Sequence, residues 1–174
     1  MPADAAGSNV DTTVDRRGAT RHVRRIDDAS AADVISVRHF AGSCHCGAIR
    51  FTFSSRLNPE SWRIRACQCR FCRRHHARTT SDPEGHVSFQ IDDDAKLQRY
   101  RFALQTADFL VCRVCGVYVA AVVASPLGRF ATLNVNTIDG VSTADAAPTS
   151  YDGETPDQRQ ERRMRQWTPV IAGT

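Results

Sequence analysis

The stretch GSCHCGAIRF at residues 42–51 carries the two patterns that decide how this chain folds. Its second half begins an alternation of apolar and polar side chains over residues 48–53, which indicates a half-buried β-strand. Its first half places Cys44 and Cys46 two residues apart, directly before Gly47. Both the alternation and the close cysteine spacing recur further along the chain, so they set the expectations for its fold and its chemistry.

Strand-like segments, either alternating or continuously apolar, recur at residues 62–66, 87–91, 97–102, 109–111 and 117–124. The continuous apolar runs are typical of strands that are buried on both faces. Turn-forming residues separate the segments at residues 57–59, 81–85, 92–94 and 125–128. Many short strands with little helical periodicity predict a mainly β domain over residues 38–140.

The two ends of the chain lack this pattern. Residues 1–37 are rich in Ala, Asp, Arg and Ser, and they bury too little apolar surface to offset the entropy of ordering. We therefore expect a flexible N-terminal tail. Residues 141–174 are expected to form a loop and a possible short polar helix at residues 157–167, docked through Met164 and Trp167.

Chain length and net charge limit the classes of protein to which this chain can belong. A chain of 174 residues suits one ordinary domain. Its 23 basic and 19 acidic residues leave a net charge of +4, which is too mild to indicate a nucleic-acid-binding face, so no nucleic-acid partner is expected. The sequence has no apolar run of the roughly 18 residues that a membrane helix needs and no readable secretory signal. We therefore expect no membrane partner and a cytoplasmic location.

The seven cysteines fall into three tight groups: Cys44 and Cys46; Cys67, Cys69 and Cys72; Cys112 and Cys115. An odd number without an export signal argues against a disulfide framework, and clustered cysteines in a reducing compartment are more often metal ligands or reactive thiols. Cysteines kept only for packing would scatter among the hydrophobic positions. The grouping therefore indicates metal binding or thiol reactivity.

The two outer groups have the spacing of one zinc site with four thiolates: Cys44, Cys46, Cys112 and Cys115. Zinc–sulfur bonds of about 2.3 Å in a tetrahedron require sulfurs roughly 4 Å apart. A Cys-x-Cys pair meets this on an extended strand, where side chains two apart share a face, and a Cys-x-x-Cys pair meets it in a tight turn. A glycine follows each pair and can adopt positive φ, which turns backbone N–H groups toward the thiolates. We expect a structural zinc here, although spacing alone leaves the pairing of the groups open.

The middle group, Cys67, Cys69 and Cys72, supplies three sulfurs. Three protein ligands leave a fourth tetrahedral position for water or substrate, as in a catalytic zinc site. Four plus three ligands account for every cysteine and predict two zinc ions per chain. Two alternatives stay open: His75 or His76 would close the site as a fourth ligand, and Cys69 and Cys72 would form a redox pair.

Six arginines crowd around the middle group: Arg63, Arg65, Arg70, Arg73, Arg74 and Arg78. A solvated basic face is one interpretation. Beside an open metal position the set indicates an anionic ligand, because guanidinium forks match carboxylates. We take Arg70 and Arg73 as the candidate substrate-binding residues.

The ordered motifs resemble one family. The motifs are, in order, residues 42–51, Cys67-x-Cys69-x-x-Cys72-Arg73 and Cys112-x-x-Cys115-Gly116. Together they resemble the glutathione-dependent formaldehyde-activating enzyme family, which shares its domain with centromere protein V. The resemblance covers residues 38–140. It implies an Mss4-like fold of small antiparallel β-sheets, with a structural zinc on the outer four cysteines and a catalytic zinc on the middle three. Gln68 stands where the family commonly has histidine, and a family glycine is missing from residues 75–78.

The resemblance also implies an activity. It predicts a zinc-dependent carbon–sulfur lyase that reversibly condenses a thiol, with glutathione the leading candidate, with a small aldehyde such as formaldehyde to give an S-hydroxymethyl adduct. The arginines would then hold the carboxylates of glutathione. The alternative is a non-catalytic, zinc-stabilised binding module that uses the basic face of residues 63–78. An open fourth coordination position favours the enzyme, and a fourth protein ligand such as His75 favours the module.

Overall fold

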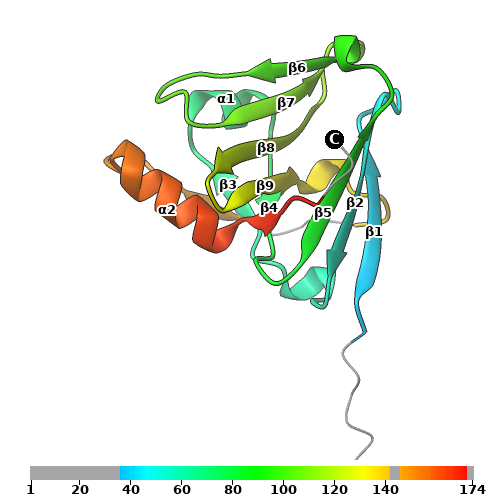
Figure 1. The fold of residues 1–174 in the computed structure, drawn as a ribbon, viewed down its shortest axis with the longest axis horizontal. Coiled ribbons are helices and arrows are strands. Elements are labelled where there is room, and N and C mark those ends of the chain that lie inside the picture. The colour runs from blue at the N-terminus through cyan, green and yellow to red at the C-terminus, as the bar shows by residue number, and fades with distance from the viewer. Residues whose placement is uncertain (1–35, 142–145, 172–174) are drawn as a thin grey trace, which may run out of the picture. The chain divides into compact units, whose positions relative to one another are not determined.

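The computed structural model describes residues 36–141 and 146–171 (Figure 1). The predicted N-terminal tail lies outside these residues, except for its last two positions. The described chain is mainly β, with strands that pair almost entirely antiparallel. Two α-helices, α1 (Arg70–Arg74) and α2 (Pro156–Gln166), and three short 3₁₀ segments complete it: Pro59–Ser61, Asp94–Lys96 and Val135–Thr137.

A small sheet contains three strands in the order β1 (Arg38–Ser43), β2 (Ile49–Ser55) and β5 (His86–Ile91). A larger sheet has the order β10 (Ala147–Thr149), β3 (Arg65–Cys67), β4 (Thr79–Thr80), β9 (Gly128–Asn134), β8 (Tyr118–Ser125), β7 (Asp108–Cys112) and β6 (Leu97–Tyr100). A short strand, β11 (Thr168–Pro169), also pairs with β9. The pairing of β10 with β3 is parallel.

The core lies on both sides of strand β8, which is buried from Tyr118 to Val123. One cluster contains Val119 and Val122 together with Phe53 and Phe89 from the small sheet. On the other side, residues of α1 and the end of α2 pack against Tyr118 and its neighbours in β8. The continuous apolar pattern of residues 117–124 reflects this double burial.

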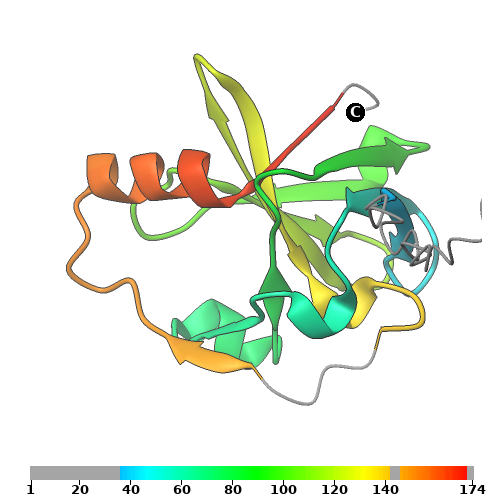
Figure 2. The same ribbon diagram turned by 90° about the horizontal axis from the view of Figure 1, so that it is seen from below.

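Helix α2 begins with a reciprocal cap. The Thr155 side chain accepts from the backbone N–H of Gln158, whose side chain accepts from the N–H of Thr155. Trp167, directly after the helix, is buried in the second core cluster. In both views α2 lies far from β1 and β2, beyond the larger sheet (Figures 1 and 2). Within the described residues, no helix has the length and apolar character needed to cross a bilayer.

Gly42 in β1 marks a close approach between strands. A Cβ at this position would lie 2.2 Å from Cζ of Phe51 and 2.6 Å from the backbone oxygen of Thr137. We expect Gly42→Ala to lower the free energy of unfolding by about 1–3 kcal/mol through overpacking. Chemical denaturation measures this, with Ser43→Ala in the same strand as the control. Equal stability of the two variants would contradict the close approach.

Candidate metal centres and an adjoining cavity

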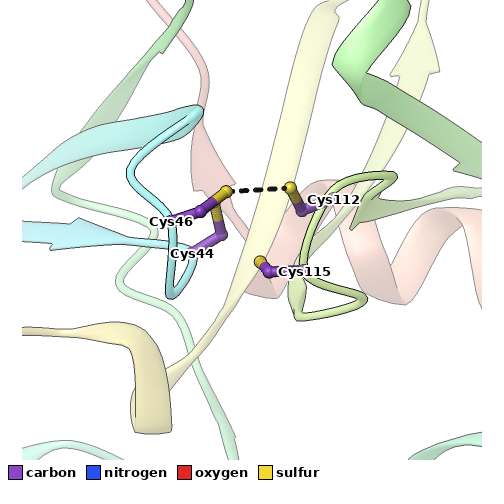
Figure 3. A group of neighbouring side chains, drawn as sticks. All are labelled: Cys44, Cys46, Cys112 and Cys115. Carbon is purple, nitrogen blue, oxygen red and sulfur yellow. Dashed lines mark hydrogen bonds between the residues drawn. The ribbon is translucent and has the colours of Figure 1, made fainter.

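The outer cysteines come together from two turns (Figure 3). Cys44 and Cys46 lie in the turn between β1 and β2, so this pair converges through a turn and not through an extended strand. The backbone N–H of Gly47 donates to the carbonyl of Cys44 at 3.0 Å, and this closes the turn. Gly116 donates to the carbonyl of Cys112 at 2.9 Å in the matching turn between β7 and β8. Both glycines have φ of +75°, so both turns use the conformation expected of glycine there.

The geometry of this four-cysteine cluster (Cys44, Cys46, Cys112 and Cys115) fits a tetrahedral metal. All four sulfurs lie within 4.8 Å of one another. The Sγ of Cys46 is 3.6 Å from the Sγ of Cys44 and 3.6 Å from the Sγ of Cys112. Four thiolates around zinc would lie about 3.8 Å apart, given bonds of about 2.3 Å. Because one turn belongs to the small sheet and the other to the larger sheet, a metal here would link the two sheets.

The second, three-cysteine cluster forms where β3 ends and α1 begins. Cys67 is the last residue of β3, Cys69 is the N-cap of α1, and Cys72 lies inside α1. Their sulfurs also lie within 4.8 Å of one another. The Sγ of Cys69 accepts a hydrogen bond from the backbone N–H of Cys72 at 3.4 Å. The sequence therefore folds locally so that all three thiols face one point.

The three thiols perturb one another strongly. Hydrogen bonds from Cys67 and Cys72 lower the pKa of Cys69 to about 2, and hydrogen bonds with Cys67 and Cys69 raise the pKa of Cys72. One sulfur thus favours the thiolate form while its neighbours hold their protons. A group that shares protons in this way is suited to a cation, which replaces the protons as thiolates gather around it. None of the seven cysteines, all within the described chain, forms a disulfide.

Neither neighbouring histidine completes the three-cysteine cluster. Within the described residues, the cluster contains the three sulfurs and no ring nitrogen of His75 or His76. The His75 ring instead packs on Phe71, with 4.4 Å between ring centroids. His76 uses its backbone carbonyl, which accepts from Asn136 at 3.0 Å. Among the residues that the structure describes, the cluster therefore offers three protein ligands to a tetrahedral metal.

All three sulfurs line an inner cavity of about 160 Å³. Its walls come from strands β3, β4, β7, β8 and β9, from α1, from α2 with the residue directly after it, and from the segments at residues 102–107 and 150–152. Apolar side chains on these walls include Phe102, Leu104, Phe109 and Trp167. A reactant in the cavity would therefore meet the three-cysteine cluster in surroundings that hold little water.

Tyr118 also lines the cavity and is only 2% exposed. Its aromatic ring packs against Phe71 and Phe109, with ring centroids 5.2 and 5.6 Å away. Burial raises the pKa of Tyr118 well above its ordinary value, and the nearby sulfurs act in the same direction. The hydroxyl is therefore a proton-bearing donor.

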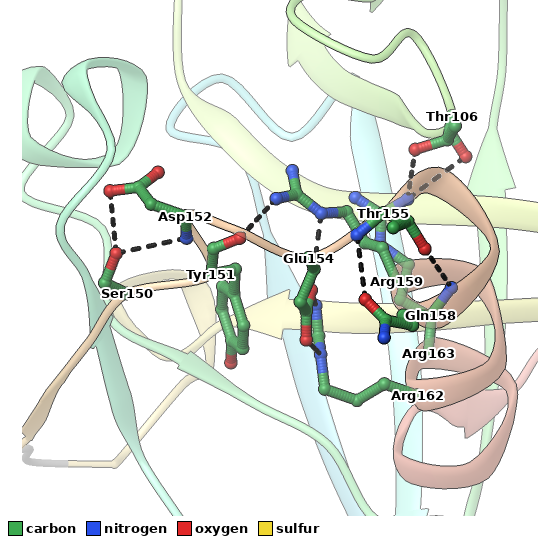
Figure 4. A network of polar contacts seen from close by, with 10 residues as sticks. All are labelled: Thr106, Ser150, Tyr151, Asp152, Glu154, Thr155, Gln158, Arg159, Arg162 and Arg163. Atoms are coloured by element: carbon green, nitrogen blue, oxygen red, sulfur yellow. Dashed lines mark hydrogen bonds and ion pairs between the residues drawn. The ribbon is translucent and has the colours of Figure 1, made fainter.

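Two arginines on the cavity wall are almost fully buried. Arg65 of β3 is 4% exposed and donates to the hydroxyls of Ser81 and Thr132 at 2.6 and 3.3 Å. Arg163 of α2 is 7% exposed and donates to the hydroxyl and the carbonyl of Thr106 at 2.6 and 3.2 Å (Figure 4). Burial lowers the pKa of both, that of Arg163 to about 10, so both keep their charge at neutral pH.

Two further arginines of α2 line the cavity but are paired. Arg162 makes two hydrogen bonds to the carboxylate of Glu154, at 2.6 and 2.9 Å, and lies over the Tyr151 ring at 3.7 Å. The Nε of Arg159 lies 3.3 Å from the same carboxylate. These contacts lower the pKa of Glu154, chiefly through the Arg162 hydrogen bond. The pairing anchors the loop before α2 (Figure 4).

The predicted substrate-binding arginines, Arg70 and Arg73, are exposed and do not line this cavity. Arg73 lines a second depression whose wall also contains Cys67 and Cys72 of the three-cysteine cluster, so a role in substrate binding stays a prediction. Our sequence reasoning missed Tyr118 and Arg163 as residues of the site. The signal for Tyr118 was its place three residues after Cys115. Arg163 follows Arg159 by one helical turn, but nothing in the sequence says which face of that polar helix is covered.

The chain is similar to a known protein family and to a solved structure. Residues 39–152, which include both cysteine clusters, match the family described as glutathione-dependent formaldehyde-activating enzyme. The chain belongs to this family. A crystal structure of a Rhodobacter sphaeroides protein is similar, with 28% sequence identity and a TM-score of 0.47, over 63% of this chain and 99% of that chain. The family assignment confirms the resemblance of the cysteine motifs. The matched residues end before α2 begins.

Proposed function

We propose that this protein is a zinc-dependent carbon–sulfur lyase, which reversibly condenses a thiol with a small aldehyde. Glutathione and formaldehyde are the leading reactants, because the family is described by them. The observation that carries the proposal is the three-cysteine cluster: it has no fourth protein ligand among the described residues, and its sulfurs line a cavity. The cytoplasmic location remains a prediction.

The proposed reaction needs no oxidant or reductant. The thiol sulfur attacks the aldehyde carbon, a carbon–sulfur bond forms, and the carbonyl double bond becomes a single bond. The proton lost by sulfur ends on the former carbonyl oxygen. In the reverse direction the same bonds break and the proton returns.

Two zinc ions would have different roles in this proposal. The four-cysteine cluster has a closed ligand set, so an ion there would stabilise the fold. Held by Cys67, Cys69 and Cys72, a zinc ion supplies Lewis acidity, which favours the thiolate form of a bound thiol and polarises a carbonyl group. The protein contributes the walls that bring the two reactants together and keep water away.

Tyr118 has a specific role in the proposed step. Its hydroxyl would donate a hydrogen bond to the carbonyl oxygen of the aldehyde as negative charge develops there. Such a donor acts strongly in a buried site, where water cannot replace it. Breakdown of the adduct would use the same contact in reverse.

We expect Tyr118→Phe to reduce the turnover number by about a hundredfold, because one donor to the reacting oxygen is lost. Its melting temperature should stay near that of the parent protein, since the ring is kept. Tyr100→Phe is the matched control, because Tyr100 is 41% exposed and lies outside the cavity lining. Equal turnover of the two variants would remove Tyr118 from the mechanism.

Exchange NMR on glutathione mixed with isotope-labelled formaldehyde tests the proposed function directly. The uncatalysed reaction, with free zinc at the same concentration, sets the baseline. Zinc-loaded protein should accelerate the exchange between free and S-hydroxymethyl forms. Protein that carries two zinc ions and gives no acceleration would overturn the glutathione and formaldehyde assignment.

The alternative function, a zinc-stabilised binding module, uses the basic face of residues 63–78. That hypothesis predicts a closed second metal site with a ligand such as His75. The position of the His75 ring on Phe71, rather than among the sulfurs, supports the lyase instead.

A further inference from the structure

The inner cavity contains two buried guanidinium groups that no described carboxylate pairs, although the thiolate-favouring Cys69 lines the same cavity. Among the described residues, neither Arg65 nor Arg163 forms an ion pair with a carboxylate. The Nε of Arg163 is buried and has no hydrogen-bond partner in the described part of the chain. Burying an unpaired charge is expensive, and two on one cavity wall call for an anion that is bound some of the time.

The other charged groups at the cavity do not supply that anion. The Glu154 carboxylate is already shared between Arg159 and Arg162. Asp152 is exposed, and its carboxylate accepts from the Ser150 hydroxyl at 2.8 Å. Arg65 and Arg163 are therefore the cavity arginines without a carboxylate partner among the described residues, and Arg163 has only the Trp167 ring 5.1 Å from its guanidinium carbon as a further charge-stabilising contact.

The two arginines come from different parts of the chain. Arg65 lies two residues before Cys67 in β3, inside the family match. Arg163 lies in α2, beyond the matched residues, and its guanidinium is held in place by Thr106. Helix α2 thus adds a cation to a cavity whose sulfurs belong to the family domain.

The size of the cavity limits what can enter it. A volume of about 160 Å³ is close to that of a protein cavity that accommodates benzene. A whole tripeptide thiol is much larger than this. The cavity therefore admits a small molecule or one end of a larger one.

We propose that the inner cavity binds the carboxylate of a thiol substrate, with Arg65 and Arg163 as its charged partners and the sulfur directed to the three-cysteine cluster. This inference rests on the proposed lyase function. The carboxylate belongs either to a small mercaptocarboxylic acid or to the glycyl end of glutathione. Both sources share the chemistry that a pair of guanidinium groups recognises.

Isothermal titration of zinc-loaded protein with 3-mercaptopropionate and with its neutral amide tests the proposal. Both probes carry the same thiol, so their difference in affinity reports the carboxylate. We expect the acid to bind about tenfold to a hundredfold more tightly, as a charge-assisted hydrogen bond predicts. The thiol pKa of 3-mercaptopropionate is higher than that of its amide, because the nearby carboxylate is negatively charged. This difference in thiol pKa alone would favour binding of the amide.

Variants of the two arginines test whether they cause the preference for the acid. Arg163→Gln should remove most of the preference for the acid, and so should Arg65→Gln in β3. Arg165→Gln is the matched control, because Arg165 is an exposed residue of α2 outside the cavity lining. Arg163→Lys keeps the charge and should retain part of the preference, which covers the case in which the glutamine variant does not fold.

The outcomes distinguish the two sources of the carboxylate, and they distinguish failure of the carboxylate site from failure of the lyase proposal. Glutathione and its glycyl amide form a second probe pair; a preference for the acid in this pair alone identifies the glycyl end as the occupant. No preference in either pair, or a preference that survives in both Arg65→Gln and Arg163→Gln, overturns the carboxylate site. A preference that depends on these arginines, without acceleration in the exchange experiment, overturns the lyase and leaves a carboxylate-binding cavity.

Discussion

Cys112→Ser is expected to unfold most of the protein at room temperature. Cys112 is 1% exposed, and its sulfur lies 3.6 Å from that of Cys46, which belongs to the other sheet. A closed zinc site contributes about 10 kcal/mol or more in small zinc-folded peptides, which is comparable to the whole stability of an ordinary domain. Losing one ligand therefore removes the link between the two sheets and most of the net stability.

Circular dichroism melting together with zinc analysis checks this prediction. The variant should bind one zinc ion fewer per chain and lose its cooperative transition. Val114→Ser is the matched control, because Val114 lies in the same turn and is 63% exposed. A Cys112→Ser protein that keeps both zinc ions and the parent melting temperature would show that the four-cysteine cluster does not stabilise the fold.

Cys69→Ser is expected to abolish the proposed activity and leave the fold intact. Cys69 is half-buried and serves as the N-cap of α1, a position that serine fills well. The variant loses a ligand of the proposed catalytic zinc, so the turnover number should fall by about a thousandfold. The zinc content should fall from two to about one per chain.

Exchange NMR and thermal melting, carried out on the same preparation, measure the two halves of this prediction. Gln68→Ala is the control, because Gln68 lies between two of the cluster cysteines but is exposed, and its side chain donates to the carbonyl of Ala66. A drop in melting temperature as large as that of Cys112→Ser would make the middle site structural. Full activity in Cys69→Ser would place the chemistry elsewhere.

Much of the β-structure follows from local patterns. The alternation at residues 48–53 corresponds to β2, and the apolar run at residues 117–124 corresponds to β8. Strand β9 was not predicted individually, because its first half is exposed and its second half is buried on both faces, which leaves no regular period. The segment at residues 62–66 alternates, yet the strand begins only at Arg65, after a 3₁₀ turn.

The sequence by itself determined the grouping of the cysteines, because ligand spacing and the following glycines are local properties of the chain. It also determined the family, because the motifs are contiguous and ordered. Only the tertiary structure decided that the outer turns meet across two sheets and that His75 turns toward Phe71. It also decided that Arg163 faces the cavity, since a polar helix has no local signal for the side that will be covered. These positions depend on contacts between segments far apart in the chain, which spacing along the sequence does not encode.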